Sequence, residues 1–277
     1  MAKKIFITGV SSGIGYATAD YFLSQGFKVI GTYRKSEDVK GFVEQYPKSF
    51  IGIKVDLSSL SEIETVPQVL NDYKIESIDF LLNNAGIALA GPLEYHPFSE
   101  VQSTLQINVL AVIRITQLIL PFLKKSAGAR VVNISSVAGI GGTPFLGVYA
   151  ASKHAVEGFS EALRRELKLY DIQVSIIGPG SIKTPIWRKN FSQIESKYDQ
   201  TEYKKSFRKF IEFAEQEERN ALHVDAVVAC VQHAFLSPSP CIRYAPVPHK
   251  WKYKFEKLIP KSIYDYLMCK TLGLLNK

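Results

Sequence analysis

Residues 3–15 have the sequence KKIFITGVSSGIG, in which a short apolar segment runs directly into a glycine-rich turn. The apolar segment predicts a buried strand, and the residues after the turn, up to about Gln25, predict a helix. Glycines at positions 9, 13 and 15 permit a tight turn and let a ligand approach the backbone closely. The free N–H groups at the start of the helix suit a pyrophosphate. The pattern favours a dinucleotide-binding site, although its Gly-x-x-x-Gly-x-Gly spacing departs from the Gly-x-Gly-x-x-Gly fingerprint and an ordinary glycine-rich turn has the same composition.

The second predicted strand, residues 28–33, bears on the choice of cofactor. It ends in Thr32-Tyr33-Arg34-Lys35, and no carboxylate follows until Glu37. In dinucleotide-binding folds an acidic residue near this point holds the ribose hydroxyls, whereas an arginine accommodates a 2′-phosphate. The sequence therefore favours NADP(H) over NAD(H), with Arg34 as the deciding residue; the alternative is that Arg34 is a solvated loop residue.

Further strands are predicted at residues 50–55, 78–82, 130–134, 173–177 and 241–247, and helical patterns separate them. This alternation predicts an α/β fold with a Rossmann-like, doubly wound parallel sheet of seven strands. The length of 277 residues and a hydrophobic content of 46% suit one domain spanning residues 1–277. Asp56 follows the third strand, where it is placed to cap the next helix, to reach the adenine, or to do both.

Three segments outside the sheet have a character of their own. Residues 185–221 mix aromatic and charged residues, among them Trp187 and Phe191, and predict either a helical lid over a ligand or a surface helical hairpin. The helix predicted at 99–125 contains Asn108, which is unfavourable in a helix and is therefore either buried in a specific network or exposed. Residues 248–277 predict a basic, helical C-terminal extension.

Tyr149 and Lys153 are the first candidates for catalysis. They lie four residues apart and therefore share one face of the predicted helix. A lysine ammonium there lowers the pKa of the phenol, which makes a tyrosine usable as a general acid or base. The same Tyr-x-x-x-Lys spacing recurs at Tyr253 and Tyr266, so the spacing alone does not single out Tyr149.

The net charge of +8 is concentrated near the C-terminus. Residues 240–277 contain eight Lys/Arg residues against two acidic residues, a net charge of +6. A solubilising tail, an anionic partner, an anionic membrane surface and a charged subunit contact all fit this pattern. No nucleic-acid-binding motif accompanies the charge, so no nucleic-acid partner is expected.

The cysteine content predicts a reducing, cytoplasmic location. Cys230, Cys241 and Cys269 form an odd, sparse set without metal-ligand spacing, so no metal is expected. No run of about 18 apolar residues is present, so the sequence predicts no membrane-spanning helix.

Several motifs occur in a characteristic order along the chain: TGVSSGIG at 8–15, NNAG at 83–86, Asn108, Ser136, Tyr149 with Lys153, and PGSIKT at 179–184. Together they resemble the short-chain dehydrogenase/reductase family, closely over residues 3–185 and more loosely to about residue 247. Ser136 lies thirteen residues before Tyr149, as in that family, whereas the corresponding positions before Tyr253 and Tyr266 hold Pro240 and Tyr253.

The resemblance implies a catalytic tetrad. Tyr149 would exchange a proton with the substrate oxygen, and Ser136 would hydrogen-bond that oxygen. Lys153 would lower the tyrosine pKa and hold the nicotinamide ribose, while Asn108 would anchor a water that relays protons. The expected cofactor contacts are Gly9, Ser11, Ser12, Gly13, Ile14, Gly15, Arg34, Asp56, Leu57, Asn84, Ala85, Gly86, Tyr149, Lys153, Pro179, Gly180, Ile182 and Thr184.

The tail RYAPVPHKW…LIPKSIYDYL resembles retinol dehydrogenases and 17β-hydroxysteroid dehydrogenase-like reductases. That resemblance implies an NADP(H)-dependent enzyme interconverting a lipophilic ketone or aldehyde and its alcohol, with a retinoid-, steroid- or lipid-like substrate. The alternatives are a non-enzymatic NADP(H)-binding sensor or scaffold and a reductase of small carbonyls or acyl thioesters. The family resemblance also implies a homodimer or homotetramer, and the basic C-terminus suggests peripheral membrane contact.

Overall fold

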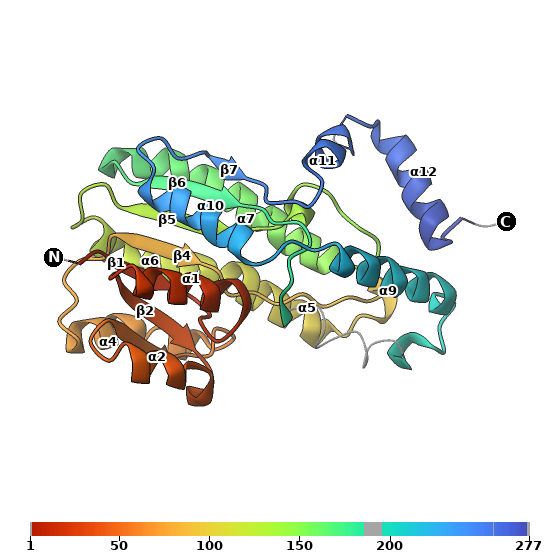
Figure 1. Cartoon of the computed structure of the whole chain (residues 1–277). Helices are drawn as coiled ribbons and strands as arrows, with labels where there is room; N and C mark the ends of the chain where they lie inside the picture. The colour runs from red at the N-terminus through yellow and green to blue at the C-terminus, as the bar shows by residue number, and fades with distance from the viewer. Residues whose placement is uncertain (1, 186–195, 257, 276–277) are drawn as a thin grey trace.

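The computed structural model of the chain describes residues 2–185, 196–256 and 258–275. It contains a seven-stranded sheet in the order β3-β2-β1-β4-β5-β6-β7, and every neighbouring pair is parallel. The predicted fold class is therefore confirmed (Figure 1). The strands are β1 (Lys4–Ile7), β2 (Lys28–Tyr33), β3 (Phe50–Lys54), β4 (Phe80–Asn83), β5 (Arg130–Ile134), β6 (Gln173–Ile177) and β7 (Arg243–Tyr244).

Helices cover both faces of this sheet, and further helices extend beyond its carboxyl edge (Figure 1). Because all strands are parallel, their carboxyl ends meet at one edge, where ligands bind in folds of this kind. The α-helices are α1 (Gly13–Ser24), α2 (Lys40–Gln45), α3 (Leu60–Ile63), α4 (Val66–Asp72), α5 (Phe98–Leu105), α6 (Ala111–Leu123), α7 (Gly147–Glu166), α9 (Lys204–Arg219), α10 (Asp225–Leu236), α11 (Lys250–Glu256) and α12 (Lys261–Leu272).

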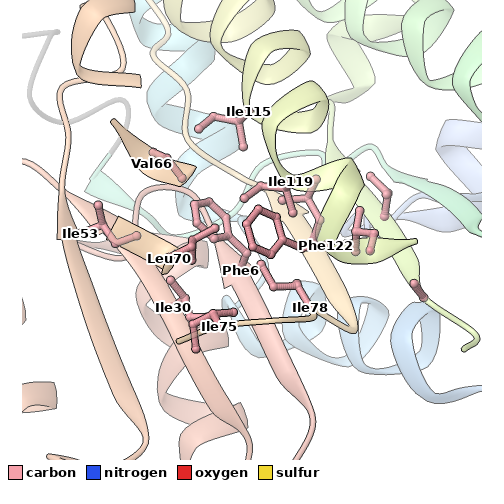
Figure 2. Close-up of a cluster of buried hydrophobic side chains, with 14 of the residues drawn as sticks. Phe6, Ile30, Ile53, Val66, Leu70, Ile75, Ile78, Ile115, Ile119 and Phe122 are labelled. Atoms are coloured by element: carbon pink, nitrogen blue, oxygen red, sulfur yellow. The ribbon is translucent and has the colours of Figure 1, made fainter. Parts of the chain in front are cut away.

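Two hydrophobic clusters hold the helices on the sheet. Successive side chains of a strand point to opposite faces, so Phe6 belongs to one cluster while Ile5 and Ile7 belong to the other. Phe6 packs in the cluster that α3, α4, α6 and α7 share, with Ile115 and Phe122 of α6 (Figure 2). Ile5 and Ile7 lie in the cluster shared with α1, α2 and α10. A sheet buried on both faces explains why the strands are continuous apolar runs.

The helix predicted at residues 99–125 is interrupted. A π-helical stretch, Gln106–Leu110, separates α5 from α6 and contains Asn108. By length and composition alone, Phe98–Leu123 would be long and apolar enough to cross a membrane, contrary to the expectation from the sequence. In the fold, however, its inner face belongs to the hydrophobic core of the sheet through Ile115 and Ile119.

Strand β7 is shorter than predicted and spans only Arg243 and Tyr244. The hydrogen bonds between the two chain segments continue beyond β7: Gly180 N donates to Pro246 O at 3.0 Å. Pro246 has no N–H to extend the ladder, which limits the regular strand. The chain then continues into α11 and α12, which lie on one side of α9, at the end of the molecule away from the amino ends of the strands (Figure 1).

Candidate active site

The turn after β1 requires glycine at three places. Gly9 and Gly13 have φ angles of +73° and +58°, in the left-handed region that glycine adopts without strain. A Cβ on Gly15 would collide with Gly9 O and the side-chain amide of Asn84. Gly15 therefore does not line the ligand cavity; it packs beneath the turn, whereas Gly9 and residues 11–14 face the cavity.

Thr8 and Asn84 join the carboxyl ends of the two central strands. Asn84 Nδ2 donates to Thr8 O at 2.9 Å and to Gly9 O at 3.1 Å. Thr8 Oγ1 accepts from Asn84 N at 2.9 Å and from Ala85 N at 3.0 Å. These contacts fix the backbone where the strand order reverses between β1 and β4, the position at which open α/β sheets bind dinucleotides.

Arg34 and Asp56 lie at the adjacent end of the cavity, after β2 and β3. Asp56 Oδ1 accepts from Ser58 N at 2.8 Å and from Ser58 Oγ at 2.7 Å. The backbone hydrogen bond from Ser58 is the main cause that lowers the Asp56 pKa, and the charge of Arg34 contributes. Asp56 does not cap the next helix, because the side chain of Ser59 does so by accepting from Glu62 N.

Ser136, Tyr149 and Lys153 are buried together at the inner end of the cavity. Ser136 follows β5 and hydrogen-bonds Tyr149. Both Tyr149 and Lys153 belong to α7, and Lys153 Nζ lies 5.9 Å from the centre of the Tyr149 ring. Lys153 Nζ donates to Ile134 O at 2.9 Å, so the ammonium points at the end of β5.

Burial dominates the ionisation of this pair. It raises the pKa of Tyr149, and the hydrogen bond with Ser136 opposes that rise. It lowers the pKa of Lys153 to about 8, against the opposing charge of Glu157. The sequence led us to expect a lowered pKa for Tyr149, whereas burial, the larger effect, raises it in this structure. The phenol keeps its proton at neutral pH and is prepared to donate it.

Asn108 is fully buried in a specific network, which decides between the two alternatives that the sequence left open. Its Oδ1 accepts from Ile87 N at 2.8 Å, and its Nδ2 donates to Ile87 O at 2.9 Å and to Ser152 Oγ at 3.0 Å. The side chain therefore ties the loop after β4 to α7, behind the cavity wall. The role of Asn108 in anchoring a water stays a prediction.

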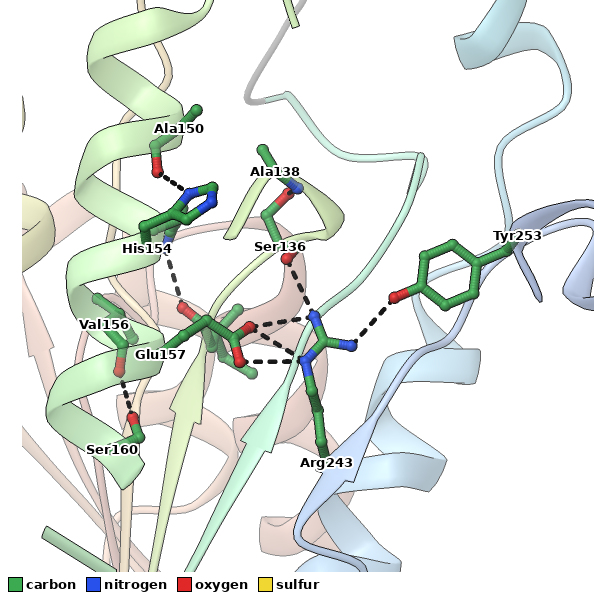
Figure 3. A network of polar contacts seen from close by, with 11 residues as sticks. Ser136, Ala138, Ala150, His154, Val156, Glu157, Ser160, Arg243 and Tyr253 are labelled. Atoms are coloured by element: carbon green, nitrogen blue, oxygen red, sulfur yellow. Dashed lines mark hydrogen bonds and ion pairs between the residues drawn. The ribbon is translucent and has the colours of Figure 1, made fainter. Parts of the chain in front are cut away.

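A second polar network, which the sequence did not predict, supports Ser136 from behind (Figure 3). Arg243 Nη2 donates to Ser136 O at 3.2 Å, and Arg243 Nε and Nη2 donate to the Glu157 carboxylate at 3.0 to 3.2 Å. Arg243 Nη1 donates to Tyr253 Oη at 3.2 Å. Glu157 lies four residues after Lys153 on the same helix face, and this spacing was the available signal in the sequence.

One cavity of about 1440 Å³ connects these parts. It runs from the glycine turn past Tyr149 to α9 and the C-terminal helices. Every predicted site residue lines it except Gly15 and Asn108. Trp187 and Phe191 of the predicted lid lie outside the described residues. Lining residues that sequence reasoning missed include His154, Val247, His249, Tyr253, Ile259, Lys261, Tyr264, Asp265 and Met268.

No metal centre accompanies the cavity in the part of the chain that the structure describes. Within that part, no group of three or more His, Cys, Asp or Glu side chains is placed to hold a metal ion. Cys230, Cys241 and Cys269 are free thiols.

Comparison with known proteins places the chain in a family. Residues 3–195 match the family model described as short chain dehydrogenase. An NADPH-dependent 3-dehydrocapnine reductase from Ornithobacterium rhinotracheale is 37% identical, with 98% of each chain covered. A 3-ketodihydrosphingosine reductase from Bacteroides thetaiotaomicron is 32% identical over 95% of this chain and 96% of its own.

Among solved structures, a short chain dehydrogenase from Burkholderia cenocepacia in complex with NADP superposes with a TM-score of 0.71. It is 26% identical, and the match covers 88% of this chain and 95% of that chain. The chain therefore belongs to the short chain dehydrogenase family, whose members are oxidoreductases that interconvert alcohols and carbonyl compounds.

Proposed function

We propose that the protein is an NADPH-dependent reductase that converts a lipophilic ketone with a long aliphatic chain into its alcohol. The observation that carries this proposal is the single cavity that joins the dinucleotide turn, Tyr149 and the C-terminal helices. Its outer part is lined by apolar side chains, among them Leu146, Phe210, Phe213 and Met268, which suit a hydrocarbon chain.

We favour a substrate with a flexible hydrocarbon chain over a rigid retinoid or steroid. The names of two relatives that match nearly the full length, the 3-dehydrocapnine reductase and the 3-ketodihydrosphingosine reductase, favour a long-chain ketone that carries polar groups near the carbonyl. In this chain the polar residues His154, Lys261 and Asp265 also line the cavity. The relation of the tail to retinol and 17β-hydroxysteroid dehydrogenases remains part of the proposal, as the source of the alternative substrates.

The residues present fit NADP(H). Gly9 and Gly13 leave the turn open to a phosphate, and the first turn of α1 contains no acidic residue that would repel one. Ser12, which begins α1, makes no side-chain capping bond. Arg34 lies where a 2′-phosphate would be recognised, and Lys153 lies where the nicotinamide ribose is expected. When bound, NADPH supplies the hydride that reduces the carbonyl carbon.

Two side chains of this protein handle the proton and the oxygen. Tyr149 holds a proton on its phenol oxygen and gives it to the carbonyl oxygen of the substrate. The Ser136 hydroxyl, which hydrogen-bonds Tyr149, orients the same oxygen. Burial of both groups excludes bulk water and strengthens these interactions.

The decisive experiment compares Tyr149→Phe with Tyr266→Phe. Both variants lose one phenol from a Tyr-x-x-x-Lys pair, but Tyr266 is exposed on α12 and does not line the cavity. With a long-chain ketone and NADPH, Tyr149→Phe lowers kcat by at least about 100-fold, whereas Tyr266→Phe retains the rate. Full activity of Tyr149→Phe would show that the mechanism is wrong.

Substrate and cofactor preference are tested together. A long-chain 2-amino ketone, retinal, a steroid ketone and a short ketone are each assayed with NADPH and with NADH. We expect the highest kcat/KM for the long-chain ketone with NADPH. Arg34→Ala raises the KM for NADPH by about 10- to 100-fold and changes the KM for NADH little. Equal loss with both cofactors would remove Arg34 from the recognition of the 2′-phosphate.

We also propose a cytoplasmic homodimer or homotetramer. Leu105 and Leu110 are exposed on the helix that carries Asn108, and an apolar helix face of this kind suits contact with a second subunit. Light scattering of the wild type and of Leu110→Lys tests this contact, because a buried lysine would dissociate the oligomer.

A further inference from the structure

The C-terminal helix α12 has one face toward the cavity and another that is exposed. Tyr264 and Met268, four residues apart, line the cavity, and Leu272, one turn further, is fully buried against the cluster around α9. On its other side Ile263 and Tyr266 are exposed. The helix therefore forms the wall of the cavity with one face and presents an apolar face to the outside.

Helix α11 and the link to α12 continue this arrangement. Tyr253 of α11 lines the cavity, whereas Trp251 and Phe255, four residues apart, are 74% and 62% exposed. Figure 1 shows the two helices following one another at one end of the molecule, on one side of α9. We call the exposed apolar residues of this segment the C-terminal apolar surface: Trp251, Phe255, Leu258, Ile263, Tyr266 and Leu267.

The charge of the same segment indicates which kind of partner binds the C-terminal apolar surface. Residues 250–277, which contain both helices, carry a net charge of +5, from seven lysines against Glu256 and Asp265. A basic segment that exposes apolar and aromatic side chains is attracted to anionic lipid headgroups and inserts its apolar residues at the membrane boundary. Tryptophan and tyrosine, present here as Trp251 and Tyr266, are the side chains that favour this boundary.

A second copy of the chain fits this surface less well. A symmetric dimer brings the same patch of two subunits together, so two segments of charge +5 would meet across the contact. Their mutual repulsion opposes such a dimer, whereas the same charge favours an anionic membrane.

We propose that the C-terminal apolar surface docks on an anionic lipid membrane. Helices α11 and α12 separate this surface from the cavity by the thickness of one helix, so docking places the cavity wall against the lipid. A long-chain ketone dissolved in the membrane then has a short path to Tyr149. Docking on the membrane does not depend on the proposed function. Only the delivery of a membrane-dissolved substrate rests on the proposed function.

Co-sedimentation of the full chain with lipid vesicles tests the docking. We expect binding to phosphatidylcholine vesicles that contain phosphatidylglycerol, little binding to phosphatidylcholine alone, and release by salt as the charges are screened. Trp251→Ser/Phe255→Ser lowers the bound fraction by at least about tenfold.

The matched control, Tyr73→Ser/Leu169→Ser, removes two other side chains that are 54% and 79% exposed, outside the C-terminal segment. It binds like the wild type. Neither pair of residues lines the cavity, so a short, water-soluble ketone serves as an independent check of folding. Wild-type inactivity toward every ketone would contradict the proposed function and leave the vesicle result intact.

Two outcomes would overturn the docking. The first is equal vesicle binding by the wild type and Trp251→Ser/Phe255→Ser. The second comes from light scattering without lipid: a wild-type dimer that becomes a monomer in this variant, together with no wild-type binding to anionic vesicles, assigns the surface to a subunit contact.

Discussion

Replacing Arg243 with methionine tests the network behind Ser136. The Arg243 and Glu157 side chains are only 21% and 15% exposed, and the arginine reaches Glu157, Ser136 O and Tyr253 Oη at 3.0 to 3.2 Å. Methionine fills much of the same volume but leaves the Glu157 carboxylate without its cation. Removing one partner of a fully buried ion pair costs about 3–5 kcal/mol.

Partial exposure of both side chains reduces that cost, so we expect a loss of about 2–3 kcal/mol in the free energy of unfolding. For a chain of this size the loss lowers Tm by about 3–5 °C. Thermal unfolding followed by circular dichroism measures it. The control is Arg165→Met, which breaks an exposed pair with Glu161 on the same helix α7 and is worth at most about 1 kcal/mol.

A second substitution separates the stranded charge from lost packing. The double variant Arg243→Met/Glu157→Gln has no unpaired carboxylate, so we expect its Tm to lie closer to that of the wild type than to that of Arg243→Met. The reasoning is refuted if the double variant is no more stable than Arg243→Met, or if Arg243→Met and Arg165→Met lower Tm equally. Because Arg243 holds the backbone of Ser136, Arg243→Met also lowers kcat more than Arg165→Met does.

Three further predictions concern the cofactor turn, Asn108 and Lys153. Gly15→Ala forces a Cβ onto the backbone of the turn and raises the Kd for NADPH in a fluorescence titration, whereas Gly41→Ala, whose Cβ would meet no atom within 4 Å, leaves it unchanged. Asn108→Leu strands buried hydrogen-bonding groups and costs about 2–4 kcal/mol, which denaturant unfolding measures; a smaller loss than about 1 kcal/mol contradicts the network. Because burial holds the Lys153 pKa at about 8, kcat/KM for NADPH falls as pH rises through that value. Glu157→Gln removes a negative charge that raises the Lys153 pKa, so in this variant kcat/KM falls at lower pH. An unchanged pH profile argues against Lys153 as the group that causes the fall.

The sequence predicted the parts of the molecule that local patterns determine. Continuous apolar runs indicated strands buried on both faces, and their alternation with helices indicated a parallel sheet. The turn at Gly9 and Gly13 was predictable because left-handed backbone there requires glycine within a few residues of the strand. The length of β7 was not, because it depends on an edge position and on Pro246.

Contacts between distant residues account for what the sequence missed. The burial of Asn108 depends on partners 21 and 44 residues away, and Arg243 meets Glu157 across 86 residues. No local pattern encodes such pairings. The C-terminal extension was predicted as basic and helical, but which face of α12 lines the cavity follows only from its packing against α9.

The ionisation of Tyr149 bears on the direction of the reaction. An unperturbed tyrosine titrates near pH 10, so at pH 7 only about one phenol in a thousand is ionised, and burial shifts Tyr149 further toward the protonated form. Reduction needs the protonated phenol as the donor, whereas oxidation needs the phenolate as the base. Lys153 Nζ donates to Ile134 O, and burial lowers the pKa of Lys153 itself to about 8. Burial of Tyr149 therefore favours the protonated phenol, which is the form that the proposed reduction needs.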